Sequence, residues 1–197
     1  MLAHPGALVV TVTAGKPPPH PLTDWDMKCG FVEGDDVIGA RRSEDEAALE
    51  HLAAQPRWLD FLDRQYMGGE SAARFDVALA IGDALRDRGP DIVASPLGLS
   101  HPDHLVTAAA CVDVARRMRE VPWVLYEDAI YRRDENLAPQ ALSRLAADGF
   151  ILEPMDIVEA GSKRSAIACY ESQLQGLGDL LDDAFLPERY WKVVARP

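Results

Sequence analysis

The sequence predicts an α/β protein with a Rossmann-like layered α/β/α architecture and a mainly parallel sheet. Two runs of mostly apolar and β-branched residues, 7–13 (ALVVTVT) and 91–97 (DIVASPL), have the length and composition of buried strands. Residues 74–88 have the pattern of an amphipathic helix, and alternation of strands with helices favours a parallel sheet with helices on both faces. The 197 residues, 48% of them apolar, can bury one sizeable core, so we expect a single domain over residues 1–197.

The first half of the chain contains one long interruption between its regular elements. Residues 16–26 (KPPPHPLTDWD) carry four prolines and are predicted to form a long loop. A helix is expected over 39–54, followed by a short strand that runs into a loop over 57–66. The helix over 74–88 is closed by Gly89-Pro90, a typical stop signal.

The second half continues the alternation. The predicted elements are a helix over 105–120, a strand over 123–127 (WVLYE), a helix over 136–148, an extended segment over 150–159 and a helix over 161–181. These elements add further strands and helices to the same layered sheet.

Composition disfavours several classes of partner. The formal net charge is −12, whereas binding to nucleic acid or to an anionic membrane needs clustered Lys and Arg. No apolar run approaches the roughly 20 residues of a membrane span, and the first residues lack the features of a signal peptide. The three separated cysteines suit a reducing compartment, so we expect a cytoplasmic protein. Neither of the common glycine-rich phosphate-binding patterns, GxGxxG and GxxxxGKS/T, occurs.

The run His101-Pro102-Asp103-His104 is the most informative for chemistry. It follows the predicted strand 91–97, and ligands bind at the carboxyl ends of strands in open α/β sheets. Proline favours the first helical position, so His101 is predicted to cap a helix that carries Asp103 and His104 in its first turn. Each imidazole can offer a nitrogen to a metal or to a reacting oxygen. The alternative is a capped helix with two exposed histidines and no site.

A resemblance to a known family covers essentially the whole chain. The segment GLSHPDH (98–104), followed by an alanine-rich helix, resembles the second signature motif of the bacterial-type LmbE/PIG-L deacetylases, which are related to the GlcNAc-PI de-N-acetylases. Five other segments resemble family segments in the same order: GARRSEDEAALEHL (39–52), LDFLDRQY (59–66), YEDAIYRR (126–133), KRSAIACYESQ (163–173) and PERYW (187–191). Ile130 stands where sugar-directed members usually have proline.

The resemblance implies roles for individual residues. His104 would be a zinc ligand, and His101, oriented by Asp103, would stabilise the oxyanion or protonate the leaving amine. Zinc would polarise the amide carbonyl and activate a water. Arg42, Asp63 and Tyr126 would hold the N-acetylated sugar or glycoside; their alternatives are a solvated helix charge, a loop carboxylate and a packed strand aromatic, respectively.

The same resemblance predicts that part of the site is absent from this sequence. The first family motif, His-x-Asp-Asp, follows the first strand and supplies two zinc ligands and the general base, yet it occurs nowhere in the 197 residues. His4 is followed by Pro5 and Gly6 and so lacks the carboxylates. We therefore expect the motif to lie upstream of Met1 and the first family strand to be missing, which leaves 7–13 and 91–97 without a shared neighbour.

Two explanations of that absence remain open. An upstream portion is left out of this chain, or the protein is a degenerate member that pairs its strands differently or with another subunit. In either case catalytic zinc, which needs about three protein ligands, should bind weakly or not at all. The oligomeric state is also open, and a homo-oligomer is compatible with the sequence.

Three functional hypotheses follow. The first is a zinc-dependent N-deacetylase of N-acetylated sugars or glycosides that is inactive as the chain stands. The second is a non-catalytic relative that binds a carbohydrate or a protein partner. The third is an unrelated α/β protein that handles sugars or nucleotides, which the absence of a glycine-rich phosphate loop disfavours.

Overall fold

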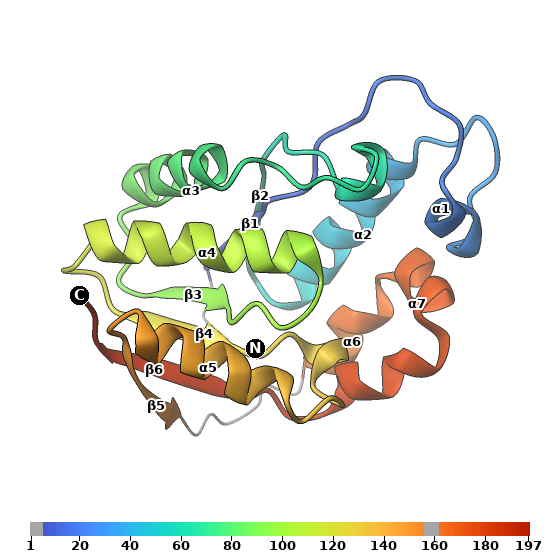
Figure 1. Cartoon of the computed structure of the whole chain (residues 1–197). Helices are drawn as coiled ribbons and strands as arrows, with labels where there is room; N and C mark the ends of the chain where they lie inside the picture. Colours follow the sequence, from blue (N-terminus) through green and yellow to red (C-terminus); the bar gives the residue numbers. More distant parts are fainter. Residues whose placement is uncertain (1–5, 156–161) are drawn as a thin grey trace. The chain divides into compact units, whose positions relative to one another are not determined.

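The computed structural model describes residues 6–155 and 162–197, which form helices and strands in the alternation that the sequence predicts (Figure 1). The chain divides into two compact units, one built from residues 1–71 and 159–185 and the other from 72–158 and 186–197. The expected single domain over residues 1–197 stays a prediction. Within the described ranges, no helix combines the length and apolar character that crossing a membrane requires.

The first unit contains a two-stranded parallel sheet. Strand β1 (Leu8–Thr11) lies beside β2 (Gln55–Trp58), with Leu8 opposite Gln55. Helix α2 (Val37–His51) connects the two strands and buries Ala48 and Leu49. This parallel strand–helix–strand unit agrees with the predicted alternation.

Two features of the first unit differ from the predictions. The prolyl loop is shorter than expected, because α1 (Asp24–Lys28) begins inside it. Thr23 caps α1 by accepting a hydrogen bond from the backbone N–H of Asp26, whose carboxylate in turn accepts one from the Thr23 N–H. Proline density predicted the loop correctly but could not show where the capping box ends it.

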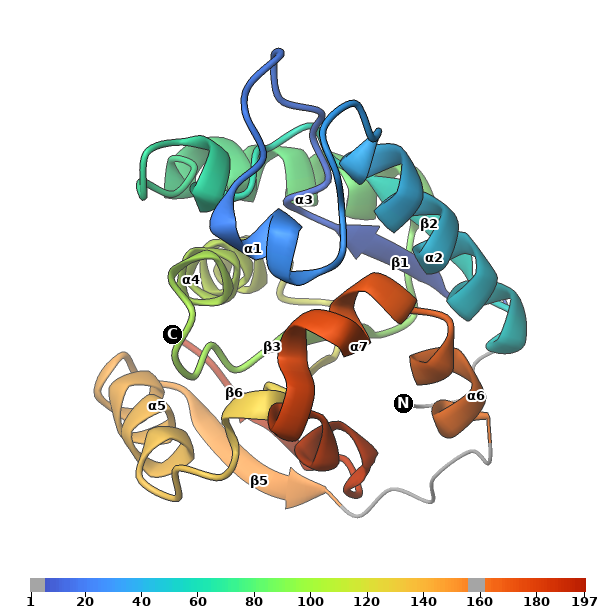
Figure 2. The same cartoon turned by 90° about the vertical axis from the view of Figure 1, so that its right-hand side faces the viewer.

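The predicted helix over 161–181 is wrong as a single element. It is divided into α6 (Lys163–Ala168), α7 (Glu171–Leu177) and a 3-10 segment, η3 (Gly178–Phe185). The break falls at Tyr170, whose hydroxyl donates to Asp45 of α2, while the backbone N–H of Ser172 donates to Glu44. These bonds to α2 interrupt the helical path, and Figure 2 shows α6 beside α2. Residue 161 of the prediction lies outside the described residues.

The second unit contains a four-stranded sheet in the order β3-β4-β6-β5. Its strands are β3 (Val93–Pro96), β4 (Trp123–Tyr126), β5 (Ile151–Met155) and β6 (Tyr190–Ala195). Only β3 and β4 are parallel; β6 runs antiparallel to both β4 and β5. The sheet is therefore mixed. The prediction of a mainly parallel sheet missed this, because β6 was not among the predicted elements. The prediction for 150–159 is confirmed as far as Met155, and residues 156–159 lie outside the described part.

The helices of the second unit are α3 (Arg74–Arg88), α4 (Pro102–Arg117) and α5 (Leu137–Ala147), with short 3-10 turns such as η2 (Ala129–Tyr131). Helix α3 has the predicted bounds and ends at Gly89, which has a left-handed φ of 61°. Helices α4 and α5 cover the same face of the sheet, where their side chains enclose a small space with those of β3, β4 and β6: Ser95, Cys111, Ala115, Trp123, Leu125, Leu145 and Val193. This packing holds α4 against the sheet, and the first turn of α4 follows the loop at the carboxyl end of β3.

The strands β1 and β3 belong to different sheets in the described structure. Strand β1 is paired with β2, and β3 is paired with β4. This agrees with the expectation that the two strands have no shared neighbour in the described chain.

Candidate functional site

The candidate site begins where β3 ends. Strand β3 is followed by the loop 97–101, and α4 starts at Pro102, so the His-Pro-Asp-His run occupies the predicted strand-to-helix junction. His101 is the N-cap: its Nδ1 accepts a hydrogen bond from the backbone N–H of Asp103 at 3.3 Å. The cap is confirmed, and it is made with a backbone group of Asp103.

A buried carboxylate just beyond the end of the neighbouring strand holds His104. Asp128, two residues beyond the end of β4, places its Oδ1 2.7 Å from His104 Nδ1. Its Oδ2 accepts hydrogen bonds from the backbone N–H groups of Gly98 at 3.0 Å and Leu99 at 2.9 Å. Asp128 thus ties the end of β4 both to the loop after β3 and to the first turn of α4.

The burial of this pair is asymmetric. The Asp128 side chain is 2% exposed, whereas the His104 side chain is 44% exposed. A carboxylate can only accept at His104 Nδ1, so Nδ1 carries a proton and Nε2 is left with its lone pair when the imidazole is neutral. A carboxylate that orients a histidine in this way is the usual support of a metal-binding imidazole.

Two aromatic rings lie beside His104. The His101 ring centroid is 5.5 Å away and the Tyr131 ring centroid 5.6 Å away, both in edge-on arrangements. Partial burial, reinforced by the negative charge of Asp128, raises the pKa of Tyr131. Tyr131 therefore stays a neutral phenol around neutral pH. Neither Asp128 nor Tyr131 was identified as a site residue from the sequence, although both lie in the YEDAIYRR segment.

Tyr126 lies at the end of β4, two residues before Asp128. Burial is the main cause of a raised Tyr126 pKa, and the Asp128 charge adds to it. Together with the buried Asp103, the second unit therefore carries four of the six predicted site residues: His101, Asp103, His104 and Tyr126.

The other two predicted residues belong to the first unit, where both have structural contacts. Arg42 donates from Nε and Nη2 to the carbonyl of Ala14, at 3.1 and 2.6 Å, and its guanidinium lies 5.0 Å from the Trp58 ring centroid. Asp63 accepts from the backbone N–H of Gln65 and caps the 3-10 turn η1 (Arg64–Tyr66). A role of either residue in holding a sugar stays a prediction.

A buried charge in the first unit was missed by the sequence reasoning. Asp26 is fully buried, and its Oδ1 accepts from Arg41 Nη2 at 2.9 Å and from the Tyr66 hydroxyl at 3.0 Å. Burial is the largest cause of a raised Tyr66 pKa. The adjacent arginines Arg41 and Arg42 offered no local signal to show which of them forms the buried pair.

The residues that the structure describes do not complete a metal site by themselves. Among those that the structure describes, no three His, Cys, Asp or Glu side chains come together as they would around a metal ion. His104 Nε2, oriented by Asp128, fits one position of a zinc site, whereas catalytic zinc needs about three protein ligands. A zinc site made of these residues alone is not supported.

Comparisons with known proteins place this geometry in context. No protein-family model matches the chain, and no match is found among curated proteins. Among solved structures, a zinc-inhibited form of the teicoplanin deacetylase Orf2 is 25% identical, with a TM-score of 0.77 over 96% of this chain and 87% of that one. The A40926 pseudoaglycone deacetylase Dbv21 is also 25% identical, with a TM-score of 0.73 over 97% and 86% of the two chains.

The chain has the fold of these deacetylases. The predicted Rossmann-like α/β class is therefore confirmed, with the correction that the larger sheet is mixed. An N,N'-diacetylchitobiose deacetylase from Pyrococcus horikoshii shares the fold more distantly, at 18% identity and a TM-score of 0.50 over 90% of this chain and 62% of that one. Because one fold can host many chemistries, the function has to be argued from the site.

Proposed function

We propose that this protein is a member of the LmbE/PIG-L group and functions as an N-deacetylase, hydrolysing the acetamide group of an N-acetylated sugar or glycoside. The observation that carries the proposal is the Asp128–His104 pair beside His101, at the carboxyl ends of two neighbouring parallel strands in a chain with a deacetylase fold. In α/β sheets this edge is where ligands bind. In this pair the Asp128 carboxylate also orients the His104 ring, as carboxylates do for metal-binding histidines.

The two histidines have different tasks in this proposal. His101 Nδ1 accepts from the backbone, so a neutral His101 carries its proton on Nε2 and can donate it to the amide oxygen or to the departing amine. His104 has the opposite arrangement, because its Nδ1 is hydrogen-bonded to Asp128 and its lone pair is therefore on Nε2. The His101 ring thus donates a hydrogen bond, whereas the His104 ring accepts one or binds a cation.

Substrate binding is proposed to involve the residues that the family resemblance indicated. Tyr126 is a neutral phenol at neutral pH, so its hydroxyl can donate to a sugar hydroxyl. Arg42 would donate, and Asp63 would accept, hydrogen bonds through the side-chain atoms that are not used in their contacts with Ala14 and Gln65.

Zinc belongs to the proposal with one condition. His104 is suited to be a single ligand, and we propose that a segment carrying His-x-Asp-Asp must supply the remaining ligands and the general base. The 197 residues alone should then contain clearly less than one equivalent of zinc after purification. A tightly bound equivalent, measured by elemental analysis, would show that the ligands are among the residues already present.

The decisive test is hydrolysis by a protein in which the His-x-Asp-Asp segment has been joined upstream. Acetate release from an N-acetylglucosamine glycoside should appear, and His104→Ala should abolish it. The matched control is His51→Ala, which removes an exposed histidine of the first unit and should leave activity intact. Full activity in His104→Ala would remove His104 from the reaction.

The second candidate is a non-catalytic relative that binds a carbohydrate or a protein partner. The lack of a three-donor metal cluster among residues 6–155 and 162–197 favours it. It predicts that the intact N-acetylated glycoside binds but releases no acetate, even when the joined segment holds zinc.

A further inference from the structure

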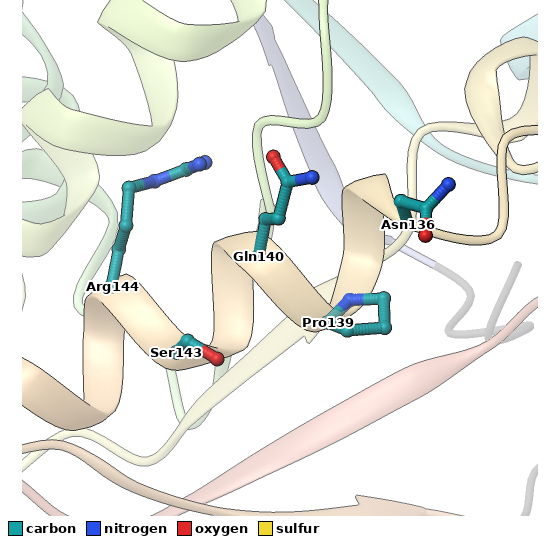
Figure 3. Close-up of a pocket in the computed structure, with 5 residues that line it drawn as sticks. All are labelled: Asn136, Pro139, Gln140, Ser143 and Arg144. Atoms are coloured by element: carbon teal, nitrogen blue, oxygen red, sulfur yellow. The ribbon is translucent and has the colours of Figure 1, made fainter.

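A polar stripe runs along one side of α5 in the second unit. Asn136, Gln140 and Arg144 are four residues apart, which places their side chains on the same helical face. Figure 3 shows the three side chains extending from one side of α5, and together with Pro139 and Ser143 they line a shallow, open depression of the surface. All five residues are exposed, so this face offers polar side chains to a ligand that lies along the helix.

This stripe is connected to the candidate site through the loop after β3. Arg144 Nη2 donates to the carbonyl of Gly98 at 3.3 Å, and the backbone N–H of Gly98 donates to Asp128. Gly98 therefore connects the Arg144 end of this face of α5 to Asp128, the carboxylate that holds His104. A ligand that occupied both places would extend from the two histidines along α5.

The chemistry of the lining indicates the kind of ligand. The amide of Gln140 and the hydroxyl of Ser143 can each both donate and accept a hydrogen bond, as sugar hydroxyl groups do. The Asn136 Nδ2 already donates to Asp134, which leaves the Asn136 side-chain oxygen as its acceptor. Arg144 adds further donors, and Pro139 adds an apolar surface. The lining contains no carboxylate that would attract a cation, and its single guanidinium is fewer charges than a phosphate-rich ligand needs.

We propose that this face of α5 is a second subsite, which binds the hydroxyl-bearing sugar unit attached to the acetylated unit of a glycoside. The proposal rests on the proposed function, because it assumes that the acetylated unit lies at His101 and His104. It deepens that function by assigning a preference for a substrate of at least two linked sugar units. Gln140, which has the central position in the stripe, is the residue predicted to determine that preference.

The test compares a monosaccharide with its disaccharide on the chain as it exists. N-acetylglucosamine and its β-1,4-linked disaccharide are titrated by NMR, and the side-chain amide signals of Gln140 are assigned by their loss in Gln140→Ala. Two or three added hydrogen bonds should make the disaccharide bind on the order of tenfold more tightly. Only the disaccharide should shift the Gln140 amide signals.

The variants separate the subsite from general effects. Gln140→Ala should lower the ratio of disaccharide to monosaccharide affinity about fivefold, the usual effect of losing one neutral hydrogen bond. The control is Gln55→Ala, at an exposed glutamine of β2, which should leave the ratio unchanged.

The outcomes distinguish the two proposals. If the monosaccharide binds and shifts the His104 signals but the disaccharide binds no more tightly, the subsite is wrong and the proposed function stands. The same conclusion follows if Gln140→Ala leaves the ratio unchanged. If neither sugar binds at all, the subsite is wrong, whereas the proposed function is decided separately by acetate release from the joined protein.

Discussion

Replacing Asp128 tests whether this carboxylate organises the candidate site. Asp128→Ala removes the hydrogen bond to His104 and both backbone hydrogen bonds to the loop after β3. Asp128→Asn keeps one oxygen acceptor and replaces the other with an amide that can only donate. The matched control is Asp148→Ala, because that carboxylate is more than half exposed and pairs with Arg116 at the surface.

The expected loss of stability follows from the burial of these groups. Hydrogen bonds to a charged group contribute about 1.5–3 kcal/mol each, and a buried donor left without a partner costs about 1–3 kcal/mol. Since a water can replace part of the lost carboxylate, we expect Asp128→Ala to lower the free energy of unfolding by about 3–5 kcal/mol and Asp128→Asn by about half as much. For a chain of this length, 1 kcal/mol corresponds to about 2–4 °C in Tm, so the alanine variant should melt about 6–20 °C lower. The surface control should change stability by less than about 1 kcal/mol.

Two measurements check this reasoning. Urea unfolding gives the change in stability, and long-range proton–nitrogen NMR spectra report which ring nitrogen of His104 carries the proton. In the unaltered protein the Nδ1–H form of neutral His104 should dominate, and in Asp128→Ala the proton should shift toward Nε2. The reasoning fails if the alanine variant loses less than about 1 kcal/mol and the His104 ring nitrogens keep their shifts.

Three further predictions concern the framework around the two units. Gly98→Ala should lower stability by about 2–4 kcal/mol in urea unfolding, because Gly98 has a φ of 75° and an added Cβ would lie 2.6 Å from the Ala108 side chain; unchanged stability would show that the loop relaxes freely. Asp26→Ala should cost about 3–5 kcal/mol by leaving the Arg41 guanidinium, which is 17% exposed, without its carboxylate, and a loss below about 1 kcal/mol would mean that the pair is solvated. Burial raises the pKa of Cys111 from 9.0 to about 12, so the folded state keeps a proton that the unfolded state releases. The associated stability is complete below pH 9 and is lost between pH 9 and 12. Cys111→Ala should therefore reduce the fall in unfolding free energy between pH 8 and pH 10 by about 1.4 kcal/mol, and an unchanged fall would contradict the assignment.

Elements whose signals are local were predicted closely. Helix α3 was predicted with its observed bounds, because an amphipathic pattern and a terminal Gly-Pro pair both act over a few residues. The cap at His101 was also predicted, since proline at the first helical position and a side-chain acceptor before it are neighbours in the chain.

Elements that depend on distant segments were predicted less well. The helix over 161–181 is divided because Tyr170 and Ser172 bond to side chains of α2 more than 120 residues earlier. Strand β6 was missed, and with it the mixed character of the sheet, because strand direction depends on which neighbours a strand finds in space.

The same division applies to the candidate site. Asp103, the third residue of the motif, was expected to orient His101, and that role stays a prediction. The structure adds that Asp128, 24 residues further along the chain than His104, holds His104. Arg42 and Asp63 were predicted from their resemblance to family segments, and the structure shows that both already support their own unit. Whether they also hold a sugar is a question for binding experiments.

The sequence by itself determined the α/β alternation, the position of the His-Pro-Asp-His run at a strand-to-helix junction and the absence of a His-x-Asp-Asp motif from the 197 residues. These properties depend on residues that are close along the chain. The tertiary structure alone decided that a buried carboxylate just beyond the end of the neighbouring strand holds His104 and that the polar face of α5 is linked to the same loop. A hydrogen bond forms wherever folding brings a donor and an acceptor within about 3 Å, and the packing of parallel strands sets that distance independently of their separation in sequence.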